Sequence, residues 1–212
     1  MAAFDYKKAY PEFYLPPRKP HLIEIPQMNF MAIRGEGDPN EAGGKYKIAI
    51  GKLYAAAYTI KMSRLSAGAP EGYFDYVMPP LESLWRMEGA CGMDYARKWA
   101  FRWIAIIRLP EFVTPEVLAS AVSEAENKKG IDLSELEYFS YSDGLCVQCL
   151  HLGPYDAEPE TVSEMEGFAA GEGYVPDLGV RQHHEIYLSD ARRCKPERLR
   201  TVIRIPVRGA ES

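Results

Sequence analysis

The feature that most constrains this chain is an order of structural signals that occurs twice. Each copy consists of strand, strand, glycine turn, helix, acid-bearing strand and a final strand that ends at a proline, and the copies cover about 21–110 and 136–207. Repetition at this level predicts one pseudo-two-fold domain, in which each copy covers a sheet face with its helix. Two such copies leave a groove where they meet, and pockets favour such junctions.

Two further correspondences support the repeat. The stretch 31–35 (MAIRG) corresponds to 149–153 (CLHLG), and Glu82 occupies the place that Glu185 holds in the second copy. The segment 114–130 then joins the copies. It predicts a helix, because Thr114 can cap its start, Pro115 suits the first helical position and glycine ends it.

The remaining elements follow from alternation, helical spacing and turn residues. In the first copy we expect strands at His21–Ile25 and 29–34, a helix at 41–63, and strands at 73–78, Leu81–Met87 and 98–109. In the second copy we expect strands at 136–141 and 145–152, a helix at 159–171, and strands at 183–190 and 200–207. The turn Ser142-Asp143-Gly144 predicts that 136–141 and 145–152 form a hairpin. Four prolines in 1–20 predict an extended arm that lies against the body.

The stretch 183–190 (HHEIYLSD) is central to function. Its alternation places Glu185 and Tyr187 on one side of a strand, with Ile186 and Leu188 on the other. If the first side lines a cavity, Glu185 is a buried charge that binds a cation or takes up a proton. If that side faces solvent, Glu185 is an ordinary surface acid.

Composition narrows the classes of function. The formal net charge of −5 and the scattered basic residues argue against a nucleic-acid partner, which requires a basic patch. No apolar run approaches the roughly 20 residues that cross a bilayer, and the N-terminus lacks a signal peptide. We therefore expect a cytoplasmic protein without a membrane partner.

The cysteines and histidines predict neither a redox centre nor a metal site. Cys146-Val147-Gln148-Cys149 matches a CxxC pattern, but it lies in a predicted strand, where residues three apart point to opposite faces. Buried structural thiols are the expected result. His183-His184 has no further histidine at ligand spacing. We expect neither a metal nor a cofactor.

The helix 41–63 carries a second candidate feature. Tyr54, Tyr58 and Lys61 form a stripe beside the apolar face of this helix. Two tyrosines in such a stripe suit the edge of a core, because tyrosine often buries its ring and leaves its hydroxyl in water. The same residues could also line a cavity.

Several segments together resemble a known family. They are 53–61 (LYAAAYTIK), 80–85 (PLESLW), 101–103 (FRW), 184–190 (HEIYLSD) and 195–201 (KPERLRT). In this order they resemble the GyrI-like small-molecule-binding domain family, and more narrowly its stand-alone bacterial subfamily, which includes cyclopropanoid cyclopropyl hydrolases. The resemblance covers nearly the whole chain from about Ile25 to Val207.

The resemblance implies an α+β fold of duplicated β-α-β-β modules, with an antiparallel sheet, helices on one side and a ligand groove between the modules. The domain would cover 21–207. In relatives fused to DNA-binding regions, a buried glutamate at the position of Glu185 anchors cationic drugs, whereas 1–20 is too short to be such a region. The expected partner is a hydrophobic, aromatic or cationic small molecule, and the protein would be a monomer or homodimer.

Two functions remain open at this point. The first is binding for sequestration or xenobiotic detoxification, in a groove whose aromatic faces stack on flat or cationic ligands. Its candidate ligand-binding residues are Glu82, Trp85, Trp103, Tyr54, Tyr58, Phe101, Glu185 and Tyr187. The second is hydrolysis of a strained cyclopropane ring, with Glu185 orienting water and Tyr187 steadying the departing electron density. Burial should raise the pKa of Glu185 in either case.

Overall fold

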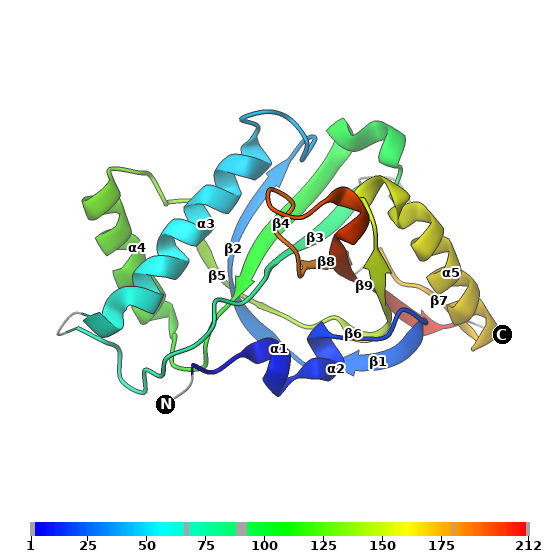
Figure 1. The fold of residues 1–212 in the computed structure, drawn as a ribbon, viewed down its shortest axis with the longest axis horizontal. Helices are drawn as coiled ribbons and strands as arrows, with labels where there is room; N and C mark the ends of the chain where they lie inside the picture. The colour runs from blue at the N-terminus through cyan, green and yellow to red at the C-terminus, as the bar shows by residue number, and fades with distance from the viewer. Residues whose placement is uncertain (1–2, 66–67, 88–92, 180, 211–212) are drawn as a thin grey trace.

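The computed structural model of the chain describes residues 3–65, 68–87, 93–179 and 181–210. In this part of the chain, one nine-stranded antiparallel sheet forms the centre of an α+β fold (Figure 1). The strands are β1 His21–Ile25, β2 Met28–Glu36, β3 Leu81–Met87, β4 Phe101–Arg108, β5 Glu137–Tyr141, β6 Gly144–Leu152, β7 Tyr174–Pro176, β8 His183–Tyr187 and β9 Arg200–Gly209. The fold class expected from the sequence is therefore correct.

Three longer helices and several short ones accompany the sheet. The long helices are α3 Lys45–Met62, α4 Pro115–Lys129 and α5 Glu158–Gly171. The short elements are α1 Tyr6–Ala9, α2 Pro11–Tyr14, η1 Ser63–Leu65, η2 Tyr95–Ala100, η3 Tyr155–Ala157 and η4 Pro196–Arg198. The signals at both ends of α4 act as expected, since the Thr114 hydroxyl accepts from the amide of Val117 and Gly130 closes the helix at φ 63°.

The strand order is β1-β6-β9-β8-β3-β4-β2-β5, with β7 beside β9. If β1, β2, β3 and β4 are matched with β5, β6, β8 and β9, this order is the same from either end. Such symmetry supports the duplication that the sequence suggests. The first strand of each half has also changed places, because β1 pairs with β6 and β5 pairs with β2.

This exchange overturns the predicted hairpin between 136–141 and 145–152. β5 and β6 follow one another around a turn but do not pair with each other, because β5 pairs with β2 whereas β6 lies between β1 and β9. The turn residue Asp143 explains the difference, because its buried carboxylate accepts from His184 and Arg204. The turn is thus fixed by contacts inside the protein, where the sequence suggested only a local reversal.

Other boundaries also differ from expectation: the strand expected at 183–190 ends at Tyr187, and the helix expected at 41–63 begins at Lys45. The segment 73–78 forms no strand and makes a single bridge, from Tyr76 to Phe4. The predicted strand 98–109 begins only at Phe101, because a 3₁₀ helix precedes it. The arm 1–20, expected to be extended, contains the two short helices α1 and α2 in its described part.

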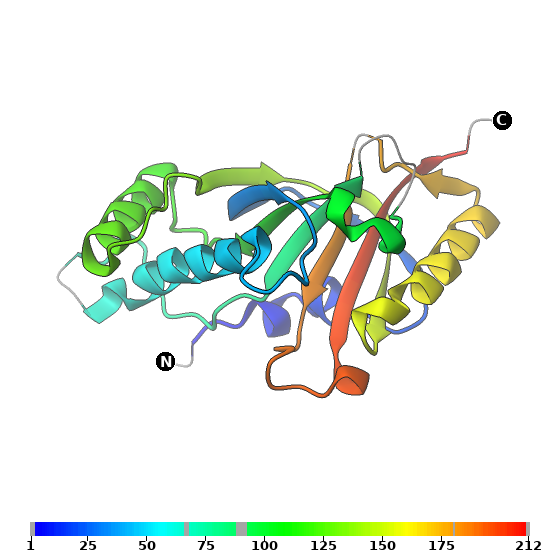
Figure 2. The same ribbon diagram turned by 90° about the horizontal axis from the view of Figure 1, so that it is seen from above.

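The two faces of the sheet are covered differently. Helices α3, α4 and α5 pack on one face, which we call the helix face, through two apolar clusters that include Leu53, Leu118 and Met165. The arm packs on the opposite face, which we call the arm face, through Tyr6 and Tyr14. Figure 2 shows α3 and α5 towards opposite ends of the long axis, with η2 between them.

Candidate functional site

Strand β8 lies at the centre of the sheet, where the two halves meet. It pairs with β3 so that Ser83 lies opposite Glu185 and Leu81 opposite Tyr187. Glu185 and Tyr187 therefore share the helix face, as the alternation predicts, and Glu185 is only 7% exposed. Of the two situations that the sequence left open for Glu185, the structure shows the buried one.

The hydroxyl of Tyr187 connects the polar groups of this face. It donates to Oε2 of Glu185 at 2.7 Å and accepts from the indole nitrogen of Trp85 at 3.1 Å. Tyr46 of α3 reaches the same oxygen at 3.5 Å and shares a 2.6 Å hydrogen bond with the hydroxyl of Ser83. Burial and then the charge of Glu185 raise the pKa of Tyr187 well above its usual value, so that the phenol keeps its proton.

The second oxygen of Glu185 is also engaged. Oε1 lies 3.1 Å from Nε2 of His183, which is almost fully buried. The carboxylate of Glu185 is thus held from both sides, by an imidazole and by a phenol. Because a carboxylate has about four acceptor positions, it can still bind a water or a ligand donor.

A second acid, Glu158, faces the same cluster from the first residue of α5. It is 1% exposed, and no hydrogen-bond donor reaches its Oε1 among the described residues. Burial raises the pKa of Glu158 well above its usual value, and the charge of Glu185 and a hydrogen bond with it raise this pKa further. Glu158 therefore keeps its proton to a higher pH than an exposed glutamate does.

Aromatic rings pack closely beside Glu185 and Tyr187. Tyr46 packs on Trp85 and Trp103 with ring centroids 5.2 and 5.1 Å apart, and Tyr155 meets Tyr187 edge-on at 5.7 Å. Phe101 lies edge-on to Trp85 at 5.8 Å. Trp85, Trp103, Phe101, Glu185 and Tyr187, all predicted site residues, are therefore brought together on the helix face.

Tyr54 and Tyr58 are not brought into this cluster. Four-residue steps along a helix advance by about 40° beyond a full turn, so a stripe in such steps rotates around the helix. Tyr46 points to the sheet, Tyr54 is partly buried, and Tyr58 is 49% exposed. The two predicted tyrosines pack against each other, 6.2 Å apart, further along α3.

Glu82 lies on the arm face, opposite to Glu185. Its neighbour across the strand pair is Ile186, and its Oε2 accepts from Nε2 of His184 at 2.9 Å. Rotation about a two-fold axis normal to a sheet moves a residue to another position on the same face of that sheet. Two residues on opposite faces therefore cannot be related by this axis. The predicted pairing of Glu82 with Glu185 as symmetric ligand residues is therefore wrong.

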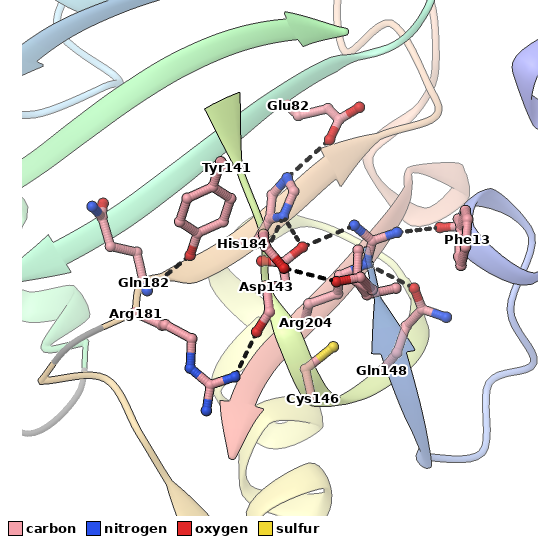
Figure 3. A network of polar contacts seen from close by, with 12 residues as sticks. Phe13, Glu82, Tyr141, Asp143, Cys146, Gln148, Arg181, Gln182, His184 and Arg204 are labelled. Atoms are coloured by element: carbon pink, nitrogen blue, oxygen red, sulfur yellow. Dashed lines mark hydrogen bonds and ion pairs between the residues drawn. The ribbon is translucent and has the colours of Figure 1, made fainter. Parts of the chain in front are cut away.

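Glu82 instead belongs to a buried polar network, shown in Figure 3. His184 contacts Glu82 through one ring nitrogen and Asp143 through the other, at 2.9 Å each. Arg204 continues the network from Asp143 to Gln148 and to the backbone oxygen of Phe13 in the arm. The arm thus closes this network from outside.

Sequence reasoning missed Tyr46 and Glu158. Tyr46 lies two four-residue steps before Tyr54, so extending the tyrosine stripe towards the start of the helix would have reached it. Glu158 gave no such signal. A glutamate before a proline at a helix start is equally explained by the positive end of the helix dipole.

A cavity of about 410 Å³ lies between η2 and α5. His183 forms part of its wall and also contacts Glu185. Lys98 of η2 binds Asp156 of η3 at 2.6 Å, which ties these two short elements together. No group of His, Cys, Asp and Glu in the described ranges is arranged to hold a metal ion.

The described helices include none that is both long and apolar enough to cross a bilayer. The CxxC thiols lie where the sequence predicts, with Cys146 buried on the arm face and Cys149 buried on the helix face. Burial raises the pKa of both thiols to about 12. Cys91 lies outside the described residues.

The fold is that of an antiparallel α+β protein with a buried polar and aromatic cluster at the centre of its sheet. A family model places it among small-molecule-binding proteins, because residues 102–208 match the GyrI-like small molecule binding domain. The chain belongs to the GyrI-like family. No curated protein matches the sequence closely enough to count as a relative.

Solved structures give closer similarities. An uncharacterised conserved protein from Listeria innocua is 44% identical, with a TM-score of 0.91 over 97% of this chain and 100% of the other. A hydrolase from the same organism is 43% identical, with a TM-score of 0.89 over 98% and 100%. The C-terminal domain of EcmrR, at 12% identity, a TM-score of 0.57 and coverage of 91% and 98%, shares the fold alone.

Proposed function

We propose that this protein binds a hydrophobic, electrophilic small molecule against the aromatic walls around Glu185 and hydrolyses it. The observation that carries the proposal is the buried pair of acids, with Glu158 1% and Glu185 7% exposed, in which burial raises the pKa of Glu158 well above its usual value. In the proposed mechanism Glu158 is the acid and Glu185 is the base. Two carboxyl groups in opposite protonation states supply a general acid and a general base at one pH. The hydrolase from Listeria innocua, similar over nearly the whole chain, supports the same direction.

A strained cyclopropane conjugated to a carbonyl-containing ring suits these groups. Water held by Glu185 attacks the ring carbon, forming a carbon–oxygen bond as the strained carbon–carbon bond breaks. The released electron pair moves into the conjugated ring, which takes the proton of Glu158, while Glu185 takes the proton from water. Transfer of that proton from Glu185 to Glu158 restores the pair, and the sum is addition of one water.

The residues around the pair have supporting roles in this scheme. His183 and Tyr187 fix the two oxygens of Glu185, at 3.1 and 2.7 Å, and thereby orient the base. Trp85 in turn holds the Tyr187 hydroxyl. Aromatic faces stack on a flat ligand, with about 0.5–1.5 kcal/mol for each pair of rings.

Sequestration without reaction is the second candidate. It is supported by the family description, which names small-molecule binding alone. Under this alternative Glu185 provides charge selectivity, and the aromatic walls provide affinity for the ligand. Detoxification of a xenobiotic would follow from either candidate, by destruction in one case and by removal from solution in the other.

The direct test is incubation of the protein with a cyclopropane-containing DNA alkylator, followed by mass spectrometry. We expect a product heavier than the ligand by one water. Glu185→Gln and Glu158→Gln should each lower the rate by about 10²–10⁴-fold, the usual contribution of a general acid or base. Glu164→Gln, which changes an exposed acid of α5, is the matched control and should leave the rate unchanged.

The pH profile separates the two acids. Wild-type activity should fall as pH rises through the raised pKa of Glu158, because the acid then loses its proton. Glu158→Gln should lose this alkaline decline. If the ligand binds tightly but is recovered unchanged, the result supports sequestration and contradicts hydrolysis. If the ligand does not bind at all, both candidate functions are rejected.

A further inference from the structure

The cavity between η2 and α5 is separate from the acid pair, although one residue borders both. Its lining comes from the segment that leads into η2, from the first turns of α5, and from β8 and β9. The lining residues are Met93, Asp94, Tyr95, Pro159, Val162, Ser163, Glu166, Leu178, His183 and Ile205. None of the ligand residues predicted from sequence is among them.

Two of the polar residues that line this cavity are acids, Asp94 and Glu166. Asp94 is neutralised, because Arg97 donates to its carboxylate at 2.6 Å. Glu166 is half-buried, and within the ranges that the structure describes no cation pairs with it. A carboxylate without a counter-ion attracts a positive charge placed beside it.

Tyr95 adds a second unmet group. Its hydroxyl is buried and has no hydrogen-bond partner among the described residues. Burial raises the pKa of Tyr95, and the negative charges of Glu185 and Glu166 raise it further. A cationic group placed beside this hydroxyl would be stabilised by the same charges.

The remaining walls are apolar. Met93, Val162, Leu178 and Ile205 offer hydrophobic contacts next to the acidic positions. Apolar walls with a few convergent polar groups are typical of small-molecule sites, and a volume of about 410 Å³ lies within their usual range. The ring of Tyr95 also offers a face for a cation–π contact.

We propose that this cavity is a second subsite, which takes a protonated amine or quaternary ammonium group carried by an apolar ligand. Glu166 provides the counter-charge, and Tyr95 provides the hydroxyl and the ring. This inference rests on the proposed function in one respect: the cationic group bound in this cavity belongs to the same ligand, in the part that does not react with water. His183, which contacts Glu185 from the other side, links the two positions.

The test uses two probes of equal shape, the benzyltrimethylammonium cation and its neutral carbon isostere neopentylbenzene. Binding is followed by NMR titration of the isotope-labelled protein. Glu166→Gln should weaken the cation about tenfold, the effect of losing one partly screened charge, and leave the neutral probe unchanged. Glu164→Gln removes an exposed acid two residues away, outside the cavity, and should change neither affinity.

A second variant tests the location. Ser163 lies exposed on α5 at the cavity wall, so Ser163→Arg places a positive group there without changing the core. It should weaken the cation more strongly than the neutral probe. Equal losses for both probes, or an effect of Glu164→Gln as large as that of Glu166→Gln, would overturn the proposal. Neither probe has a reactive ring, so the outcome is independent of whether hydrolysis occurs.

Discussion

At the scale of single residues, the position of Trp103 depends on the glycine across the strand pair. Gly35 lies opposite Trp103, and a Cβ built on Gly35 would come within 2.3 Å of the indole ring. The ring is buried and cannot swing away, because it packs edge-on to Tyr46. The wall of the site therefore requires that Gly35 has no side chain.

Gly35→Ala should destabilise the protein by about 1–3 kcal/mol, the usual cost of overpacking a core. It should also shift the tryptophan emission, because the indole must move. Gly51→Ala is the control: Gly51 is exposed in α3 with nothing within 4 Å of its Cβ position, so alanine should stabilise the helix by about 0.5–1 kcal/mol. Chemical denaturation measures both, and equal effects would contradict the packing argument.

The position of a side chain was predictable from sequence where the alternation of a strand determines which face of the sheet the side chain lies on. Alternation in β8 placed Glu185 and Tyr187 on one face, and the structure agrees. The same rule could not relate β8 to β3, because the register between two strands is not contained in either of them. Glu82 was therefore assigned to the wrong face, although each strand was identified correctly.

At the scale of elements, four strands and the arm are joined by the network around His184. Burial opposes a charge on this histidine, but the carboxylates of Asp143 and Glu82 outweigh that effect and raise its pKa to about 9. The imidazolium is thus the central cation between β3, β8 and the turn before β6. Such a group couples the pairing of these elements to pH.

Stability should therefore fall as pH rises from 6.5 to 9. The raised pKa of His184 stabilises the folded state fully below the unfolded pKa of 6.5, and this stabilisation is lost as pH rises through the folded pKa of about 9. The free energy of unfolding should fall by roughly 3 kcal/mol over this range, at 1.36 kcal/mol for each pKa unit. Denaturation at several pH values measures the change. His184→Gln should flatten it, whereas His151→Gln, which changes a buried histidine held by Thr161 and a backbone oxygen, should not.

A rise of stability over this range, or an equal effect of the two substitutions, would contradict the assignment.

The turn before β6 also explains a failure of sequence reasoning. Ser142-Asp143-Gly144 has the composition of a hairpin turn, yet Asp143 serves this network and the strands part. Turn composition reports local geometry, whereas strand pairing is decided by contacts distant in sequence.

At the scale of the whole molecule, the exchanged strands bind the two halves together. β1 belongs in sequence to the first half and completes the second, and β5 does the reverse. Neither half can therefore keep its sheet if the other unfolds. The repeat was visible in sequence as an order of elements, but the exchange was not, because it depends on pairing between distant strands.

We expect one cooperative unfolding transition. The three tryptophans, at positions 85, 99 and 103, report on the first half, whereas the buried thiols of Cys146 and Cys149 report on the second. Tryptophan emission and thiol accessibility should therefore change at the same denaturant concentration. Emission that changes while these thiols remain protected would show that the halves unfold separately.

The buried thiols have a further consequence under the proposed function, in which the ligand is an electrophile. Cysteine sulfur is a strong nucleophile, and it reacts as the thiolate. Burial raises the pKa of Cys146 and Cys149 to about 12, so both thiols remain protonated at neutral pH, and the sheet keeps both away from solvent. The fold thus removes two nucleophiles that would compete with water for a reactive ligand.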